Sequence, residues 1–512
     1  MICRFLLLLF LCFSILPRGG HHAQADVGVF KSKLPRISME ASEVVGLWSA
    51  FLELSKQGEK PLDVSGDGAQ STRSKLRLRI QEVSPHFFAR AKVIMSSIET
   101  PFSSKRPIYP RAKASPNVSC HLILNTQVNL ARDLLDFEVA TRLRSLCSTS
   151  IHVELFDLLH TLAPLYHQVI WEPQSEALER YVSDTNRYIQ THLPLIEKTL
   201  EQIQRFYGAQ IPQRIPYIAK AYPTLKEGHL NAKAYGYRLP ISVDPQSHDY
   251  ARSLSIITHE LSHELYGSQP LSLMSELEGA FKADPSRDAL NAHILINEAL
   301  ATALNNGGLM YARLTGSVKK SSWYYHPEVD RYAQALYPHL SSFLEGEKTM
   351  DAEFIRLCIQ VYQEALSREP LPLRSILAGG ALLTQTREQG SMISPLLSQD
   401  RLSTPPLLIS PLKHKQTQEF ILKKYDENKA IIIYAESRAQ LLESLGEGLN
   451  SVLSEALRGL KPDEKAQAVL HLHEVRAPIL FLISPDQEGL KELTKQLWRQ
   501  RHFSLGSTII SL

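Results

Sequence analysis

The sequence of 512 residues predicts an α+β fold, in which a mostly helical core contains a small β-sheet and precedes a small α/β domain. Three features of the chain support this fold class. Apolar residues recur at helical spacing over most of residues 38–208 and again over 250–366. Short β-like runs, broken by Pro and Gly, lie between these stretches at 215–245. Near the C-terminus, three apolar β-like runs are each followed by a helix-like segment.

The N-terminus has the features of a secretory signal peptide. Arg4 precedes a twelve-residue apolar run at 5–16, and an A-x-A cleavage pattern ends at Ala25. This run is shorter than the roughly 20 apolar residues that cross a bilayer, and no other stretch approaches that length. We therefore expect cleavage near Ala25 and a secreted or periplasmic protein with no stable membrane span. An uncleaved anchor is the alternative.

Composition and charge narrow the functional classes. The formal net charge of +3 falls by two, to +1, when Arg4 and Arg18 leave with the signal peptide, so a partner such as nucleic acid is not expected. A hydrophobic content of 44% and a charged content of 21% are typical of a globular chain and exclude disordered, collagen-like and coiled-coil classes. Three of the five cysteines, Cys120, Cys147 and Cys358, remain after the signal peptide; they permit one disulfide in an exported protein, and three free thiols fit equally well.

The patterning predicts five segments along the chain. After the signal peptide at 1–25, an N-terminal helical region covers 26–210, and a domain containing the small sheet covers 211–370. A stretch rich in Ser, Thr and Pro at 371–405 predicts a linker. Residues 406–512 predict an accessory α/β domain with no recognisable catalytic motif.

The pattern H-E-x-x-H occurs at residues 259–263 of a predicted helix. His259 and His263 are four residues apart and stand one turn apart on the same helix face, so both imidazoles can reach one tetrahedral zinc ion. Glu260 lies about 100° further round the helix and can reach a metal-bound water without being a ligand. An apolar stripe occupies the opposite side of the helix, so the histidines do not belong to that stripe. A chance match on a solvated helix is the alternative.

A zinc site with two histidines needs a third protein ligand, and Glu298 is the candidate. It is the only formally charged side chain within 289–312, in a helix expected to have Asp284 as its N-cap and to end before Gly307. Burying an unpaired carboxylate costs several kcal/mol, so a lone Glu in so apolar a helix indicates a cation. The alternative is an ordinary surface carboxylate. The same helix face carries three polar residues able to orient a ligand, namely Asn291, Thr302 and Asn305.

Together the two motifs resemble those of the gluzincin metallopeptidases, in which a helix after H-E-x-x-H donates a glutamate, often within N-E-x-x-A, here at 297–301. The resemblance covers roughly residues 215–310. It implies a metallopeptidase-like core in which His259, His263 and Glu298 bind one Zn²⁺ ion.

The resemblance also implies the roles of neighbouring parts. Glu260 would activate the zinc-bound water, and a strand within NAKAYGYRLPISVD would pair with the backbone of a peptide or protein substrate. Thirty-four residues separate His263 from Glu298, which predicts an additional helix between them. Gluzincins usually add a Tyr or His that donates to the developing oxyanion. Several side chains could take this role, and the choice stays open among Tyr324, Tyr325, His326, Tyr332, Tyr337 and Tyr362.

The sequence therefore predicts an exported zinc-dependent metallopeptidase. A catalytically inactive, metallopeptidase-like binding protein in the extracytoplasmic space is the main alternative, because metal ligands can persist where turnover is lost. An interaction protein with an accidental motif is a third. No P-loop, G-x-S-x-G elbow or dinucleotide fingerprint points to another chemistry.

Overall fold

The computed structural model describes most of the chain after residue 35. The described residues are 36–57, 72–99, 120–143, 148–209, 215–225, 231–284, 286–366 and parts of 377–511. The expected signal peptide and Cys147 lie outside them. Within these ranges no helix is both long and apolar enough to cross a membrane. The described chain is mostly helical with two sheets, which confirms the α+β class.

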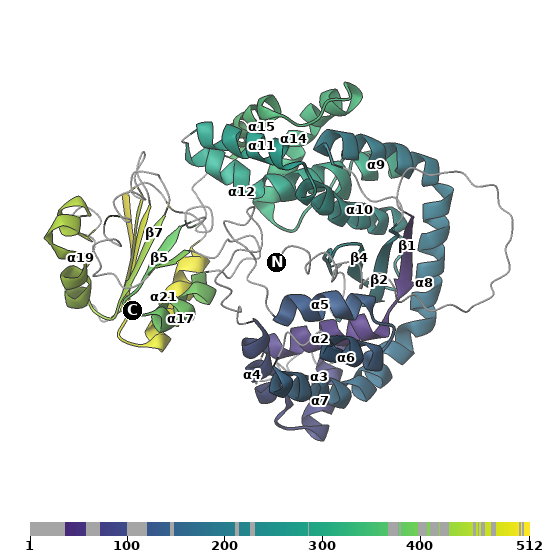
Figure 1. The fold of residues 1–512 in the computed structure, drawn as a ribbon, viewed down its shortest axis with the longest axis horizontal. Helices are drawn as coiled ribbons and strands as arrows, with labels where there is room; N and C mark the ends of the chain where they lie inside the picture. Colours follow the sequence, from purple (N-terminus) through teal and green to yellow (C-terminus); the bar gives the residue numbers. More distant parts are fainter. Residues whose placement is uncertain are drawn as a thin grey trace, which may run out of the picture. The chain divides into compact units, whose positions relative to one another are not determined.

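The N-terminal helices pack around one apolar core (Figure 1). Large aromatic side chains such as Phe51 and Phe87 fill it, with ring centroids 6.3 Å apart. These helices are α2 (Glu43–Gln57), α3 (Thr72–Val83), α4 (Phe87–Glu99), α5 (Cys120–Leu130), α6 (Leu134–Leu143) and α7 (Thr149–Tyr166).

The cysteines differ in their state. Cys120 is disulfide-bonded and Cys358 is a buried free thiol, so the alternative with three free thiols is wrong.

A four-stranded sheet with the order β1-β2-β4-β3 precedes the motif helix. Its strands are β1 (Ile37–Ala41), β2 (Tyr217–Pro223), β3 (Asn231–Ala232) and β4 (Arg238–Val243). The strands expected between 215 and 245 are confirmed, and β3 pairs antiparallel with β4 at the sheet edge. Strand β1 corrects the expectation of helix from residue 38, because it pairs parallel with β2 from Ile37 opposite Tyr217. Five residues are too few to distinguish helical from strand spacing.

The helices that follow build a second apolar core. They are α8 (Glu172–Thr191), α9 (Leu193–Tyr207), α10 (Tyr250–Gly267), α11 (Leu271–Ala283), α12 (Arg287–Ala301), α13 (Leu309–Thr315), α14 (Pro327–Glu345) and α15 (Ala352–Leu366), with π-helical turns η2 (His167–Trp171) and η3 (Thr302–Asn306). The apolar stripe of α10 is buried here through Leu254, Ile257 and Leu261. Helix α11 is the additional helix predicted before Glu298. Helices α8 and α9 also contribute to this second core, although they lie within the N-terminal helical region predicted at 26–210.

The C-terminal part is a six-stranded sheet with the order β10-β8-β9-β7-β5-β6, in which β6, β5, β7 and β9 run parallel. Its elements are β5 (Ala381–Leu383), α17 (Arg387–Leu397), β6 (Leu407–Ile409), β7 (Ile431–Ala435), α19 (Arg438–Val452), β8 (Gln467–Leu472), β9 (Ile479–Ile483), α21 (Gln487–Arg499) and β10 (Gly506–Ser511). Helix α19 packs on one face, and α17 and α21 pack on the other (Figure 1).

The first strand of this sheet lies before residue 406, where the α/β segment was predicted to begin. The predicted linker at 371–405 contains β5 and α17, and β5 lies between β7 and β6 inside the sheet. A three-residue strand that is buried on both faces has no alternation of polar and apolar residues, so the pattern of the sequence did not indicate it.

Candidate metal centre

Helices α10 and α12 carry the residues of the two motifs. Helix α10 begins after Asp249, whose carboxylate accepts a hydrogen bond from the Arg252 N–H at 3.0 Å. Helix α12 begins at Arg287, because the Ser286 hydroxyl caps it by accepting from the Ala289 N–H at 3.1 Å. Asp284 was the expected cap, and this expectation is wrong. The Asp284 carboxylate instead accepts a hydrogen bond from the N–H of the cap residue Ser286 at 2.8 Å.

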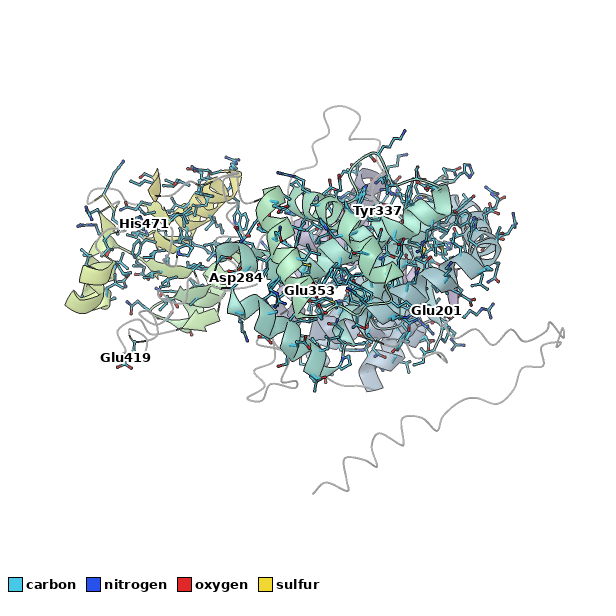
Figure 2. All side chains as sticks on the ribbon, turned by 90° about the horizontal axis from the view of Figure 1, so that it is seen from above. Glu201, Asp284, Tyr337, Glu353, Glu419 and His471 are labelled. Atoms are coloured by element: carbon cyan, nitrogen blue, oxygen red, sulfur yellow. The ribbon has the colours of Figure 1, made fainter. Side chains whose placement is uncertain are left out.

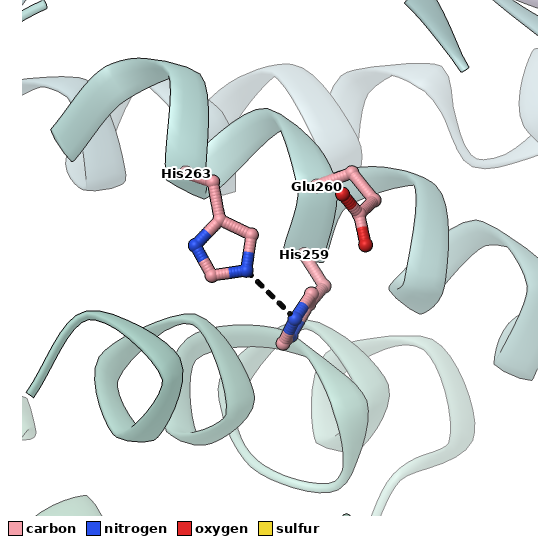
Figure 3. A group of neighbouring side chains, drawn as sticks. All are labelled: His259, Glu260 and His263. Carbon is pink, nitrogen blue, oxygen red and sulfur yellow. Dashed lines mark hydrogen bonds between the residues drawn. The ribbon is translucent and has the colours of Figure 1, made fainter. Parts of the chain in front are cut away.

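Three side-chain atoms from these helices converge on one point. The Nε2 atoms of His259 and His263 lie 3.1 Å apart, and Figure 3 shows the two imidazole rings nearly perpendicular, with Glu260 on the same helix beside them. The Oε2 atom of Glu298 lies 3.5 Å from His259 Nε2 and 3.6 Å from His263 Nε2. We call these three atoms the ligand triangle. The structure therefore brings together the three residues predicted to hold a metal.

The ligand triangle has the size that zinc requires. With Zn–N and Zn–O bonds of about 2.0–2.2 Å at tetrahedral angles, neighbouring ligand atoms stand about 3.3 Å apart. The observed separations of 3.1, 3.5 and 3.6 Å lie on both sides of this value. Two imidazole nitrogens and one carboxylate oxygen are also a donor set that leaves a fourth position for water or substrate. The residues fit a catalytic type of zinc site.

Burial distinguishes these side chains from an accidental surface cluster. His259 is only 4% exposed and His263 is half-buried, so the histidine pair does not sit on a fully solvated helix face. The Oε2 atom of Glu298 is buried against the two imidazoles at 3.5 and 3.6 Å, so Glu298 is not an ordinary surface carboxylate. A buried carboxylate is costly unless a positive charge, from a protonated histidine or a metal ion, compensates it.

Without a metal ion, the histidines compensate the charge of Glu298. Burial lowers the pKa of His263, but hydrogen bonding to Glu298 and its negative charge outweigh burial and raise the pKa to about 9. Burial raises the pKa of Glu298, but the two histidines outweigh it and hold the pKa well below its ordinary value. Glu298 is thus a partly buried anion, and a proton on a neighbouring imidazole occupies the place where a metal ion would supply the positive charge.

One residue outside the ligand triangle orients a ligand. Asn297 Oδ1 lies 3.0 Å from His263 Nδ1 and accepts a hydrogen bond from the Nδ1–H group. In this tautomer the Nε2 atom of His263 has a lone pair that can bind a metal. The Nδ1 atom of His259 is buried without such a partner. The polar residues expected to orient a ligand are buried, but Asn305 donates to Ser262 at 2.9 Å instead.

Glu260 is held by the hairpin that joins β3 to β4. Its Oε2 atom accepts a hydrogen bond from the Ala234 N–H at 2.8 Å. The carboxylate therefore has a fixed position beside the two histidines. One carboxylate oxygen of Glu260 and one ring nitrogen each of His259 and His263 lie within 4.8 Å of one another. The same hairpin carries β3, the edge strand of the sheet. The expected base and the expected substrate-pairing strand are thus in direct contact.

Of the six side chains that the sequence left open for the oxyanion role, Tyr324 lies at the candidate metal centre. Its ring stacks on His259 with a centroid distance of 6.0 Å and an interplanar angle of 19°. Burial and the negative charge of Glu298 raise the pKa of the Tyr324 phenol well above its ordinary value, so it remains a donor. Tyr332 is fully buried and donates to the Cys358 carbonyl, so it does not reach the site.

Sequence reasoning did not identify Asn297 and Ala234 as parts of the site. Asn297 had a signal, because it precedes Glu298 in the N-E pattern. Ala234 had none, because it acts through its backbone N–H, which every residue except proline has.

No protein-family model, curated protein or solved structure matches the chain. The resemblance to gluzincins therefore depends on the motif residues and their geometry.

Proposed function

We propose that this chain is an exported zinc-dependent metallopeptidase of gluzincin type. The observation that carries the proposal is the ligand triangle, in which two imidazole nitrogens and a buried carboxylate oxygen stand 3.1, 3.5 and 3.6 Å from one another. His259, His263 and Glu298 would hold the ion. Zinc supplies Lewis-acid activation of water and of a carbonyl group.

Glu260 would act as general base and then as general acid. Its carboxylate takes a proton from the attacking water and passes it to the leaving amine of the scissile peptide bond. The hydrogen bond from the Ala234 N–H supports this role, because it fixes the carboxylate next to the metal ligands. The free edge of β3 would pair with the backbone of an extended peptide substrate.

Tyr324 would donate a hydrogen bond to the oxyanion that forms on the substrate. Its phenol lies beside His259 and keeps its proton because of burial and the nearby negative charge. Removing one such donor costs about 10²–10³ in kcat. Tyr324→Phe should therefore lower kcat by this factor without changing zinc affinity, and equal turnover by the two proteins would assign the donor elsewhere.

The test compares Glu260→Gln with a matched carboxylate variant, Glu201→Gln, on the exposed surface of α9 (Figure 2). Glu264 is on the motif helix, but it is half-buried and accepts a hydrogen bond from Gly236, so it is a poor control. Wild type and Glu201→Gln should cleave peptides, stop after treatment with a chelator and recover with zinc. Glu260→Gln should keep zinc and lose about 10²–10⁴ in rate.

Each contrary outcome has its own meaning. Equal rates for Glu260→Gln and wild type would contradict the mechanism. Cleavage that survives complete metal removal would require an unidentified serine or cysteine nucleophile. Zinc binding by all three proteins without any peptide cleavage would favour the binding-protein alternative.

A further inference from the structure

The loop between α13 and α14 places an exposed aromatic side chain beside the metal centre. Tyr325 is 68% exposed, the highest value for a large hydrophobic side chain among the described residues. Its ring lies 4.6 Å from that of Tyr324, which in turn stacks on His259 at 6.0 Å. A continuous series of rings therefore leads from a ligand of the proposed metal to the solvent.

Hydrogen bonds hold the backbone of this loop in place. Asp330 accepts from the N–H groups of Trp323 and Tyr324 at 2.6 and 3.0 Å. The Trp323 indole N–H donates to the Lys319 carbonyl at 2.8 Å, and the Lys319 N–H donates to the Gly307 carbonyl at 3.0 Å. The exposed ring is therefore presented by a fixed backbone.

Packing fixes the loop as well. Trp323 is 8% exposed and meets Tyr337 edge to face at 5.6 Å. A Cβ atom at Gly307 would stand only 2.2 Å from the Trp323 ring, so this close packing requires glycine. Such a preorganised loop loses little conformational freedom when a ligand binds to it.

We propose that Tyr324 and Tyr325 form a substrate subsite for an uncharged aromatic or large apolar side chain next to the scissile bond. This inference rests on the proposed peptidase function. When the scissile carbonyl group of a peptide is at the metal, the side chain next to that carbonyl lies close to His259. The rings of Tyr324 and Tyr325 lie there, because Tyr324 is 6.0 Å from His259 and Tyr325 is 4.6 Å from Tyr324. Leaving a large aromatic ring exposed has no folding benefit, whereas stacking a substrate ring on it covers both apolar surfaces. Tyr325 is the specificity-determining residue of this subsite.

The experiment measures binding of two small zinc chelators to the zinc-loaded protein by calorimetry. Phenylalanine hydroxamate and glycine hydroxamate carry the same chelating group and differ only in the benzyl side chain. Wild type should bind the phenylalanine compound about tenfold more tightly, the upper end of the contribution of an aromatic pair. Tyr325→Ala should remove this preference, and Tyr325→Phe should keep it. Leu135→Ala, which removes an apolar side chain that is 66% exposed on α6, is the matched control and should change nothing.

The outcomes separate the subsite from the peptidase proposal. An equal preference in wild type and Tyr325→Ala, no preference in wild type, or failure of both hydroxamates to bind would overturn the subsite. Cleavage of a blocked peptide library is measured in parallel. If Tyr325→Ala cleaves peptides with zinc and keeps the selectivity of wild type for aromatic residues, the subsite proposal is wrong and the proposed function stands. If wild type binds both hydroxamates with the expected preference yet cuts no peptide, the peptidase proposal fails, and Tyr324 and Tyr325 form a binding site for an aromatic side chain but not a substrate subsite.

Discussion

The C-terminal sheet and helix α12 each bury a polar group, the Gln467 amide and the Glu298 Oε2 atom, and the partners of these two groups differ. In the C-terminal sheet, both ends of the Gln467 amide bond the backbone of Lys461, at 2.8 and 2.9 Å. On α12, both amide atoms of Asn291 are buried without a hydrogen-bond partner, and so is the Oε2 atom of Glu298 two turns later. An unpaired buried polar group costs about 1–3 kcal/mol, and a charged group costs more.

This difference shows which of the two groups has a role that folding alone explains. The paired amide of Gln467 contributes to the stability of its sheet and needs no ligand. The carboxylate oxygen of Glu298 faces two histidines, so a proton on an imidazole or a bound cation compensates its charge. Chemistry is therefore expected in the α10 and α12 region, and a supporting role is expected for the C-terminal sheet.

The largest expected effect on zinc affinity follows from removing the Glu298 carboxylate. Glu298→Ala should weaken zinc binding by several orders of magnitude, because two histidines and water hold zinc far less tightly than three protein ligands. The matched variant Glu201→Ala, which removes an exposed carboxylate, should leave the affinity unchanged. Competition titration with a chromophoric chelator measures both. Equal affinities would mean that the third ligand is another residue.

A smaller effect is expected from the residue that orients His263. Asn297→Ala should weaken zinc binding by about 10–100-fold, because His263 loses the partner that fixes its ring and tautomer. Asn291→Ala removes a buried amide from the same helix that has no contact with a ligand and serves as the control. If both variants lose affinity equally, the effect belongs to the stability of α12 and not to orientation of the imidazole.

The smallest effect should come from removing the C-terminal sheet. The two cores before Leu366 contain no residue of this sheet, and the cores of the sheet begin at Leu377. A chain that ends at Leu366 should therefore keep the zinc affinity of the full chain. Because β5 and α17 belong to the sheet, a cut near residue 405 would leave an unpaired fragment. Loss of zinc from a folded chain that ends at Leu366 would show that the two regions are not independent.

Local patterns predicted the parts of the molecule whose signal lies within one helix. The spacing of His259 and His263 and the apolar stripe of α10 depend only on the helical period, and the lone charge of Glu298 is visible in its own helix. The pairing of β1 with β2 joins residues about 180 positions apart, and no local pattern records it. Likewise, several tyrosines share the segment after α13, and only tertiary packing brings Tyr324 to the site.

The zinc content of the purified mature protein tests the central claim most directly. Among the described residues, the potential metal-binding groups all lie around His259 and His263, so elemental analysis after purification with sufficient zinc should find about one zinc ion per chain. A folded protein that contains no zinc under these conditions would contradict the metal site, and with it the proposed peptidase.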